Sequence, residues 1–542
     1  MRIIYALPLF LLTACNAAKE KIDLLVHHAT IYTVDSSFST AEAMAIKDGK
    51  ILETGSNEAL LKKYEAKETL DAKGQFIYPG FIDAHAHFYS YGLGLQAADL
   101  TGTDSWQSII DTLRSFSTSH PDGWLIGRGW DQNDWNEKEF PNNEALNILF
   151  PDRPVLLSRI DGHAAIANNK ALEMANLKPG ITITGGTAEV RNGRLTGILV
   201  DNAIDLVSRI IPDPHPQQIK QGLLDAQQRC FAMGLTTIDD CGLPYQVAEL
   251  IDRLHKSGEL KMRLYVMLSD GKANFDYLFA KGRIKTDRLH INGFKVYADG
   301  ALGSRGACLL KPYSDKPNWS GFLLSAPEHF DSVANILYNK NFQMCTHAIG
   351  DSGNRTILNT YAKYLKGPND RRWRIEHAQV VNKADFGLFG KYSIIPSVQP
   401  THATSDMYWA EQRLGPDRVR GAYAFNDLLK QNGWIPLGTD FPVEDISPFK
   451  TFFAAVIRKD AKGWPANGYQ TENALSRDAA LRGMTIWAAK SNFEEREKGS
   501  LEKGKVADFV LLNADIMKAA ESELLGVNVQ QTYVNGEKVY QK

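Results

Sequence analysis

A chain of 542 residues, 44% of them hydrophobic and 23% charged, is long enough to bury a large core and has the composition of a folded globular protein. This length corresponds to one large domain with insertions, or to two or three domains. The 61 basic residues nearly balance the 63 acidic ones, giving a formal net charge of -2, and no long basic run occurs. We therefore expect no nucleic acid among its partners.

The N-terminus has the pattern of a secretory signal: one basic residue precedes an apolar run from Ile3 to Leu12 that is too short to span a bilayer. The tetrapeptide LTAC at positions 12 to 15 resembles a bacterial lipobox, in which cleavage leaves Cys15 as the lipidated first residue. Because Asn16 follows, the usual sorting pattern favours the outer membrane. Residues 1 to 20 thus predict a lipid anchor at a membrane surface of a bacterial cell envelope, facing the periplasm. The alternative is a plain secretion signal with a chance cysteine.

The other four cysteines, Cys230, Cys241, Cys308 and Cys345, are widely spaced and form no C-x-x-C pair. A chain of this size needs no covalent staples, so we interpret them as mostly buried apolar side chains. A disulfide between Cys230 and Cys241 remains the alternative in an oxidising compartment.

Both ends of the chain are predicted to be rich in β-strands. Residues 21 to 79 alternate short apolar runs with turn signals such as the Asp-Gly pair at 48 and 49. Residues 500 to 542 repeat this pattern around the Asn-Gly pair at 535 and 536. Since lone hairpins are marginally stable, we expect the two ends to assemble into one small β-sandwich. His27 and His28 lie in this part and receive no site role.

Residues 80 to 499 alternate short β-prone apolar runs with longer helical patterns, which is typical of repeated βα units and a parallel sheet. One helical pattern is PQQIKQGLLDAQQRCFAMG, with Leu223, Ala226 and Cys230 near one face. Eight candidate strands fit an α/β fold of the TIM (β/α)8 barrel type. They are FIDAHAHF, GLTTIDDCG, MRLYVML, INGFKVYADG, FQMCTHAIGD, RWRIEHAQ, YSIIPSVQPTHA and WIPLGTDFPV.

One segment departs from this repeat. Residues 98 to 214, after the first strand, are rich in Gly, Asn, Asp and Trp and include GRGWDQNDWNE. We expect a large insertion here that caps the mouth of the barrel.

The first barrel strand ends in His85-Ala86-His87, and residues two apart in an extended strand point to the same side. The two imidazoles can therefore hold one ion, although an isolated His-x-His is a weak motif. In a TIM barrel the active site lies at the carboxyl ends of the strands. The polar residues at the other predicted strand ends are Lys295, His347, His377 and Asp440, and their positions allow all of them to meet the histidine pair at one mouth.

Imidazoles and a carboxylate are ligands of zinc and similar divalent ions, and such a set leaves an open position for water. A cationic lysine would be repelled by a metal, so Lys295 is either a salt-bridged structural residue or a modified ligand. If metal charge drives its nitrogen neutral, that nitrogen can add carbon dioxide and become a carbamate, an anion able to bridge two metals.

Five segments at these strand ends resemble the signature of the amidohydrolase superfamily, in the branch that includes N-substituted formamide deformylases. In chain order they are PGFIDAHAHF, GFKVYADGALGSRGA, THAIGD, RIEHAQ and GTDFPVE. The closing GSLEKGKVADFVLLNAD is similar to that family's return to its β-sandwich, and GWDQNDW and DGHAAIANNKAL resemble segments of that branch's insertion. The resemblance covers nearly all of the chain after the signal.

Carried onto this sequence, the resemblance implies a metal-dependent hydrolase that binds one or two divalent ions, with zinc expected. The implied ligands are His85, His87 and Asp440 for one ion and His347 and His377 for the second, with carboxylated Lys295 as the bridge. No ligand position departs from the family pattern.

Such a centre is expected to hydrolyse an amide-type C–N bond other than a peptide bond. Metal coordination lowers the pKa of water towards ~7, and the metal polarises the carbonyl. Asp440 takes the proton of that water and passes it to the departing nitrogen. Three further residues are candidates for contacting a small amide substrate: His402, His163 and Arg305. For the two histidines a buried structural role is an equal alternative, and for Arg305 a solvated or salt-bridged position is favoured.

Other functions remain compatible with the sequence. The same centre could act on a cyclic imide or an ester, or catalyse an isomerisation, because fold and metal site do not fix the substrate. A non-enzymatic lipoprotein that binds metal or a ligand is the other class. Loss of Asp440 or Lys295 would indicate that class, and both residues are present. The sequence specifies neither the substrate nor the oligomeric state.

Overall fold

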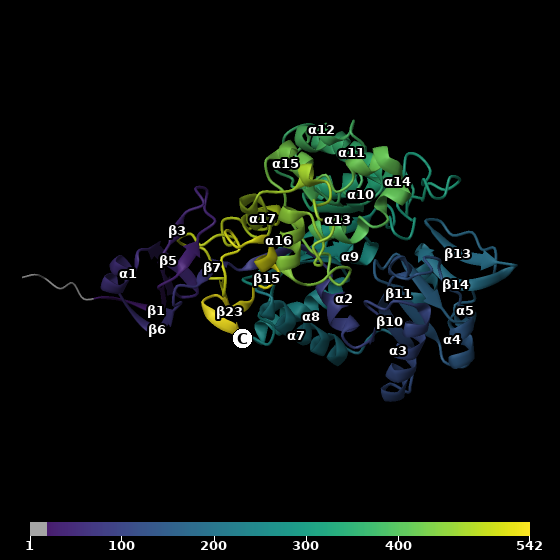
Figure 1. Ribbon diagram of the computed structural model, residues 1–542, viewed down its shortest axis with the longest axis horizontal. Helices are drawn as coiled ribbons and strands as arrows, with labels where there is room; N and C mark the ends of the chain where they lie inside the picture. Colours follow the sequence, from purple (N-terminus) through teal and green to yellow (C-terminus); the bar gives the residue numbers. More distant parts are fainter. Residues whose placement is uncertain (1–18) are drawn as a thin grey trace, which may run out of the picture.

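The computed structural model describes residues 19–542, and its strands form four sheets (Figure 1). The predicted lipidation site, Cys15, lies outside the described residues. Within the described range, no helix combines the length and the apolar character needed to cross a bilayer.

The central sheet is parallel along its main path and nearly closes into a barrel. Its order is β21-β20-β19-β18-β16-β15-β8, with the short antiparallel β17 paired to β18. The strands are β8 (Phe81–Ala86), β15 (Leu235–Leu243), β16 (Arg263–Ser269), β17 (Ile284–Lys285), β18 (Leu289–Tyr297), β19 (Gln343–Ala348), β20 (Arg374–His377) and β21 (Ile395–Ser397). Seven of the eight predicted barrel strands are therefore regular strands.

The eighth predicted strand, WIPLGTDFPV, is not a regular strand, although its backbone occupies the gap between β21 and β8. Gly438 N–H donates to Val398 O (3.0 Å) on one side, and Ala84 N–H donates to Leu437 O (3.1 Å) on the other. Pro436 has no N–H to donate, and Asp440 has a left-handed φ of 66°, so no continuous ladder forms. The segment is thus joined to its two neighbours by several backbone hydrogen bonds, among them Asp440 N–H to His85 O (2.7 Å) and Val398 N–H to Pro436 O (3.2 Å), without forming a regular strand.

Alternate residues of the barrel strands face different surroundings, as the period of two requires. On β16, Leu264, Val266 and Leu268 belong to the main hydrophobic core, which also contains residues of the surrounding helices. Tyr265 and Met267 between them cluster with cysteines of β15 and β19 inside the barrel. Both faces of these strands are buried, which explains their nearly continuous apolar runs.

Helices follow the barrel strands and cover them. They are α2 (Phe88–Gly94), α7 (Pro216–Ala232), α8 (Tyr245–Lys256), α9 (Lys272–Lys281), α10 (Pro327–Lys340), α11 (Asp351–Leu365), α12 (Phe386–Lys391), α13 (Pro400–Asp406), α14 (Ala410–Arg418), α15 (Phe425–Asn432), α16 (Pro448–Ile457), α17 (Arg477–Gly483) and α18 (Ile486–Ser491). The predicted helix at α7 is present: Pro216 occupies its first turn, His215 caps it, and Leu223, Ala226 and Cys230 are buried.

Two sheets lie at the end of the molecule where the chain begins (Figure 1). One has the order β5-β4-β1-β6 and the other β24-β23-β22-β7-β2-β3, so the second joins strands from both ends of the chain. The N-terminal elements are β1 (Glu20–His27), β2 (Thr30–Tyr32), β3 (Thr40–Ala41), β4 (Ala43–Lys47), β5 (Lys50–Gly55), α1 (Asn57–Lys63), β6 (Tyr64–Asp71) and β7 (Phe76–Pro79). The C-terminal ones are β22 (Phe509–Leu512), α19 (Glu521–Leu524), β23 (Val529–Val534) and β24 (Glu537–Gln541).

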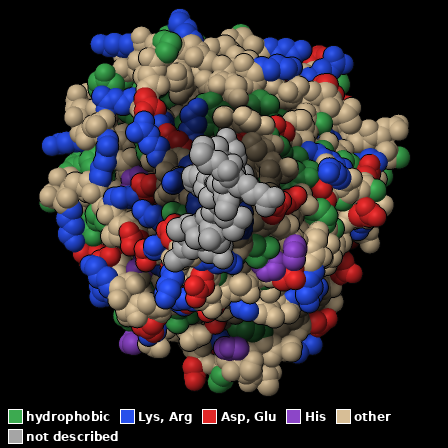
Figure 2. Space-filling model, turned by 90° about the vertical axis from the view of Figure 1, so that its left-hand side faces the viewer, with side chains coloured by type: hydrophobic (Ala, Val, Ile, Leu, Met, Phe, Trp, Pro, Cys, Tyr) green, Lys and Arg blue, Asp and Glu red, His purple; other side chains and the backbone are tan. Residues whose placement is uncertain are grey.

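These two sheets share a hydrophobic cluster that includes Val26, Met44, Ile77 and Phe509. Side chains of both charge signs are intermixed on the face seen in Figure 2.

The residues between β8 and α7 form a separate six-stranded sheet at the opposite end of the molecule (Figure 1). Its strands are β9 (Ala98–Asp99), β10 (Leu125–Trp130), β11 (Val155–Arg159), β12 (Ala164–Ala167), β13 (Gly186–Arg191) and β14 (Arg194–Asp201). The helices of this part are α3 (Trp106–Ser119), α4 (Glu144–Leu149), α5 (Asn169–Met174) and α6 (Asn202–Ser208). Trp130 and Trp135 are buried in its core, whereas residues of its loops reach the cavity described next.

Candidate metal centre

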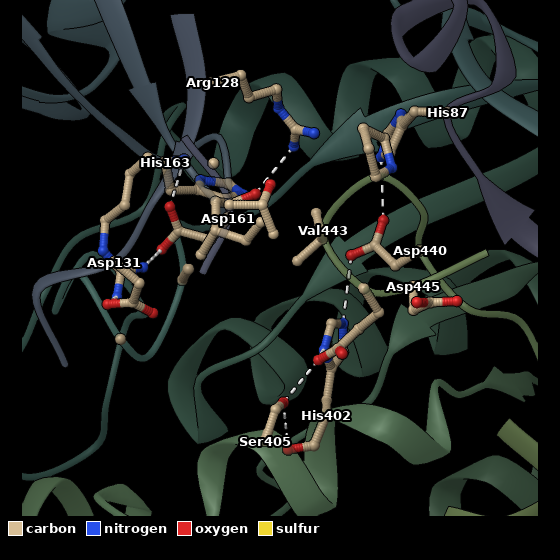
Figure 3. Close-up of a pocket in the computed structure, with 18 of the residues that line it drawn as sticks. His87, Arg128, Asp131, Asp161, His163, His402, Ser405, Asp440, Val443 and Asp445 are labelled. Atoms are coloured by element: carbon tan, nitrogen blue, oxygen red, sulfur yellow. Dashed lines mark hydrogen bonds and ion pairs between the residues drawn. The ribbon is translucent and has the colours of Figure 1, made fainter. Parts of the chain in front are cut away.

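A cavity of about 890 Å³ opens at the carboxyl ends of the barrel strands. Its lining combines barrel residues with residues of the segment between β8 and α7. The barrel side includes His87, Lys295, Tyr297, His347, His377, His402 and Asp440, and the other side includes Arg128, Asp131, Arg159, Asp161 and His163. Figure 3 shows several of these side chains pointing into the shared space.

His85 and His87 stand at the end of β8, and acceptors outside the cavity fix both rings. His85 Nδ1 lies 2.6 Å from Glu376 Oε2, and His87 Nδ1 lies 3.1 Å from the carbonyl oxygen of Cys241. Both partners can only accept, so each Nδ1 carries the proton and each Nε2 keeps a lone pair. His85 is fully buried, while His87 reaches the cavity.

His347 and His377 stand at the ends of β19 and β20. His377 Nδ1–H donates to Gln399 Oε1 (2.7 Å), which again leaves Nε2 as the free nitrogen. His347 Nε2 is buried and has no hydrogen-bond partner among the described residues. The ring centroids of His347 and His377 are 4.6 Å apart, and those of His377 and His85 are 4.8 Å apart. Residues from three distant segments therefore form one cluster.

Lys295, at the end of β18, is fully buried beside this cluster. Its Nζ lies 3.1 Å from His85 Nε2 and 4.9 Å from the centre of the Tyr297 ring. Burial alone would lower the pKa of Lys295, but the neighbours Tyr297, Cys241, Glu376 and Asp440 outweigh it and raise that pKa. The surrounding side chains by themselves thus keep Lys295 protonated.

Asp440 follows the irregular eighth segment and faces the histidines. Its Oδ1 lies 3.1 Å from His87 Nε2 and 3.5 Å from His85 Nε2, and its Oδ2 lies 3.3 Å from His402 Nε2 (Figure 3). Its left-handed φ is sparsely populated by residues other than glycine, and Asp440 N–H is held by His85 O (2.7 Å). Such strained conformations persist where surrounding contacts over-determine them, which is typical of functional sites.

The environment sets the protonation states of the cluster. Burial, followed by the charge of Lys295, lowers the pKa of His85 to about 4, and burial also lowers the pKa of His347 and His377 well below the usual range. Burial would raise the pKa of Asp440, but the hydrogen bond from His402 holds it well below its ordinary value. Neutral imidazoles and an ionised carboxylate are the forms that bind metal.

The residues present fit a divalent cation. His85, His377 and Asp440 offer ligand atoms that all lie within 4.8 Å of one another. His347 Nε2 is buried without a hydrogen bond to any of residues 19–542 and lies 3.8 Å from Asp299 Oδ1. The nitrogen and oxygen donors are those that zinc prefers, and the histidine Nδ1 contacts are the outer hydrogen bonds usual for metal-ligating imidazoles.

Two of the three candidate substrate contacts lie at the cavity. His402 lies in α13 rather than at the end of a strand, and its Nδ1 is 3.0 Å from Glu444 Oε1. His163 Nδ1 is 2.6 Å from Asp201 Oδ1, and its ring centroid lies 4.9 Å from that of His347.

The position of Arg305 agrees with the salt-bridged alternative that the sequence favoured. Arg305 does not line the cavity, and its Nη2 lies 2.9 Å from Asp315 Oδ2. The loop after β18 turns this side chain away from the ligands, and sequence proximity to Lys295 does not reveal that direction.

The sequence analysis missed the residues that support the ligands. Glu376 pairs with both His85 and Arg374, and Arg374 Nη1 lies 3.0 Å from Asp239 Oδ2, all of them fully buried. Asp299 accepts from the N–H groups of Ile349, Gly350 and Cys308, and thereby holds the loop after His347. One sequence feature could have revealed them: Glu376, Arg374 and Asp239 are charged residues inside apolar runs that are predicted to be buried strands.

The four cysteines of the described range are free, so the alternative Cys230 to Cys241 disulfide is absent. Cys230, Cys241 and Cys345 are buried, in keeping with an apolar role.

The chain is similar in sequence to a known protein family and to individual proteins of known name. Residues 68–540 match the model of the Amidohydrolase family. The chain is 33% identical over 541 residues to Protein LONG AFTER FAR-RED 3 of Arabidopsis thaliana, an alignment that covers 96% of this chain and 91% of that protein. It is 23% identical to N-substituted formamide deformylase of Arthrobacter pascens, covering 96% of this chain and 98% of the relative.

A solved structure has a similar fold along nearly the whole chain. It is an uncharacterized metal-dependent hydrolase from Pyrococcus horikoshii OT3, with a TM-score of 0.76 and 28% identity, covering 92% of this chain and 99% of that one. Together with the clustered histidines, lysine and aspartate, the match to the family model shows that this chain belongs to the amidohydrolase family.

Proposed function

We propose that the protein hydrolyses an amide-type C–N bond of a small molecule with the help of one or two divalent ions, zinc being the ion that best suits the donors. The observation that carries the proposal is the orientation of the histidines. Acceptor groups outside the cavity occupy the Nδ1 atoms of His85, His87 and His377, which leaves their Nε2 atoms for a cation beside Asp440. The name of the deformylase relative supports an amide-type substrate.

The proposed ligands divide into two groups. His85, His87 and Asp440 would hold one ion, and His347 and His377 would hold a second, with carboxylated Lys295 as a ligand that both could share. A bound ion lowers the pKa of a coordinated water towards ~7 and polarises the substrate carbonyl. Because the surrounding side chains keep Lys295 protonated, carboxylation of its nitrogen depends on the added positive charge of the metal.

Asp440 is the proposed proton carrier. As the water oxygen bonds to the carbonyl carbon, a carboxylate oxygen of Asp440 accepts the released proton. The same oxygen returns it to the nitrogen as the C–N bond breaks, so the products are an acid and an amine. Its Oδ2 faces His402 Nε2, whose hydrogen bond keeps this oxygen in place.

His402 and His163 are proposed to contact the substrate from opposite parts of the chain. His402 shares hydrogen bonds with Asp440 and Glu444, and His163 is paired with Asp201. Burial would lower the pKa of each ring, but these carboxylates raise it. Both rings therefore favour a protonated form. The Nε2–H of His163 can donate to an oxygen atom of a substrate, whereas both N–H groups of His402 are engaged by Glu444 and Asp440, so His402 would contact a substrate through its ring.

Metal analysis of the purified protein, combined with turnover of a panel of N-acyl amines, cyclic imides and esters, tests this proposal. We expect bound zinc or a similar ion, hydrolysis of N-acyl amines, and loss of turnover after chelation. Asp440→Asn should lower kcat by roughly 10²- to 10⁴-fold, the usual contribution of a positioned acid or base. Full activity of this variant would rule out the proton carrier, and turnover of imides or esters alone would reassign the substrate.

We also propose that the enzyme works in a bacterial cell envelope, anchored at the outer membrane through lipidated Cys15 and facing the periplasm. The support is the lipobox-like LTAC followed by Asn16. Labelling with a radioactive fatty acid in cells is expected to mark the wild-type chain and not a Cys15→Ser variant.

A further inference from the structure

Arg128 is a charged residue of the cavity that the proposed mechanism does not use. It belongs to β10, in the segment between β8 and α7, and its side chain is half-buried. Its Nη2–H donates to the carbonyl oxygen of Ile160 (2.9 Å). In the view of Figure 3, the guanidinium points into the space between Asp161 and His87. It therefore faces the same cavity as the ligand cluster.

Arg128 makes no ion pair with any carboxylate of residues 19–542, unlike Arg159 and Lys450, two other cations of the cavity. Arg159 pairs with Asp131 and Asp161, and Lys450 pairs with Asp445. Asp161, whose charge acts on Arg128, is already engaged, since it also accepts from His163 N–H (3.0 Å). The charge of Arg128 is thus available to pair with an anionic group of a molecule that enters the cavity.

The hydrogen bonds of Arg128 support this conclusion. A guanidinium has five N–H donors, and the described residues accept from one of its nitrogens. Burial lowers the pKa of Arg128, partly opposed by the charges of Asp440 and Asp161. A cation that has lost part of its hydration without gaining a partner is costly, and a bound anion offsets that cost.

We propose that Arg128 binds the carboxylate of the substrate, so that the enzyme acts on N-acylated amines that carry a carboxylate, of which N-acyl amino acids are the simplest class. This inference rests on the proposed amide hydrolysis. The planar guanidinium matches a carboxylate in geometry. A dianion such as a phosphate is disfavoured, because the carboxylates of Asp131, Asp134, Asp161 and Glu444 also line the cavity.

The placement of the two groups gives the substrate an orientation. Arg128 comes from the segment between β8 and α7, whereas the ligand cluster comes from the barrel. Arg128 would hold the carboxylate of the substrate, and the amide group would lie beside the ligand cluster of the barrel. Arg128 is therefore a binding residue, and its removal should affect charged and neutral substrates differently.

Matched substrates test the proposal. The panel consists of N-formyl and N-acetyl amino acids, each paired with the N-acyl amine that lacks the carboxylate, and kcat/KM is measured for both members. In Arg128→Gln, kcat/KM for the carboxylate member should fall by roughly 10- to 100-fold, the loss expected for a charged hydrogen-bonding partner. The neutral member should change less than about twofold, and Arg128→Lys should be intermediate.

Arg114→Gln is the control, because Arg114 is an exposed arginine of α3 outside the cavity and should behave as wild type. An unchanged preference for carboxylate substrates in Arg128→Gln would overturn the proposal, as would a wild-type enzyme that prefers the neutral members. A second arm measures binding of the N-acetyl amino acids and their neutral partners to the metal-loaded protein by calorimetry. Carboxylate selectivity there that is lost in Arg128→Gln supports the role of Arg128 even if no amide is hydrolysed, and equal selectivity in both proteins refutes it.

Discussion

Two histidine clusters in this molecule differ in what surrounds them. His85, His377 and Asp440 in the barrel, and His27, His28 and Asp71 in the N-terminal sheet, each bring three ligand atoms within 4.8 Å of one another. In the barrel cluster the Nδ1 atoms of the histidines are bonded to Glu376 and Gln399, and the ring faces are buried.

In the second cluster the potential ligand atoms are bonded to one another. His28 Nδ1 lies 3.0 Å from His27 Nδ1 and 3.1 Å from Asp71 Oδ1, and His28 and Asp71 are exposed. Water and these mutual hydrogen bonds already satisfy the polar atoms. The potential ligand atoms therefore lie close together in both clusters. Of the two, only the barrel cluster has further hydrogen-bond partners that hold the Nδ1 atoms of its histidines and thereby direct the Nε2 lone pairs toward one point.

The largest expected difference between the two clusters is the effect of removing one histidine from each. His377→Ala should lose metal and activity, while His28→Ala should keep both. Loss of an outer partner typically weakens metal binding by about 10- to 100-fold, and loss of a ligand should exceed this range. The measurement is the metal content per chain after dialysis, together with kcat. Equal metal loss in both variants would contradict the expectation that only the barrel cluster binds metal.

A smaller effect is expected from the outer partner of a ligand. Glu376→Gln keeps an acceptor near His85 but removes the negative charge shared with Arg374, so metal affinity should fall by roughly 10- to 100-fold. Asp71→Asn, which makes the same change in the exposed cluster, should leave affinity unchanged. Competition with a chromogenic chelator provides the measurement, and wild-type affinity in Glu376→Gln would show that the outer charge is unimportant.

The smallest effect concerns how stability depends on pH at two carboxylates, the half-buried Asp406 of the cavity and the exposed Asp71. Burial raises the pKa of Asp406 to about 7, whereas the N–H of Lys73 lowers that of Asp71. The folded state therefore loses stability at Asp406 as pH rises from about 4 to about 7, because the unfolded chain ionises first. At Asp71 it keeps a contribution above about pH 4 and loses it as pH falls.

Asp406→Asn should accordingly gain roughly 1–3 kcal/mol relative to wild type between about pH 5 and pH 8. Its amide oxygen can still accept from Tyr423 and Gln379, the present partners of Asp406. Asp71→Asn should show the opposite slope in the acid range. Denaturant unfolding at several pH values measures both, and parallel curves for Asp406→Asn and wild type would contradict the expectation.

The ligand positions could be predicted because they follow from local patterns. His85, Lys295, His347 and His377 each end an apolar run, and the carboxyl ends of parallel strands meet at one mouth. The eighth segment was predicted as a regular strand and is irregular. Pro436 and the left-handed φ of Asp440 interrupt its hydrogen bonding to β21 and β8, and this interruption depends on how those neighbours pair with it.

The supporting and binding residues were harder to recognise because their roles depend on contacts between distant segments. Glu376 is separated from His85 by 291 positions, and Asp299 acts through backbone N–H groups that carry no residue-type pattern. Arg305 and Arg128 illustrate the same limit. Both are arginines near polar segments, and only the fold pairs the first with Asp315 and leaves the second without an ion pair among the described residues.

The segment between β8 and α7 follows the first histidine pair in the chain, and after α2 it forms a sheet of its own. It supplies Arg128 and His163 to the cavity, and the barrel supplies all six proposed ligands. If Arg128 and His163 bind the substrate as proposed, part of the substrate choice is encoded outside the stretches that encode the ligands, and mutation of this segment should alter selectivity while leaving the ligands in place. Exchange of the segment between relatives would then yield amidohydrolases with altered selectivity.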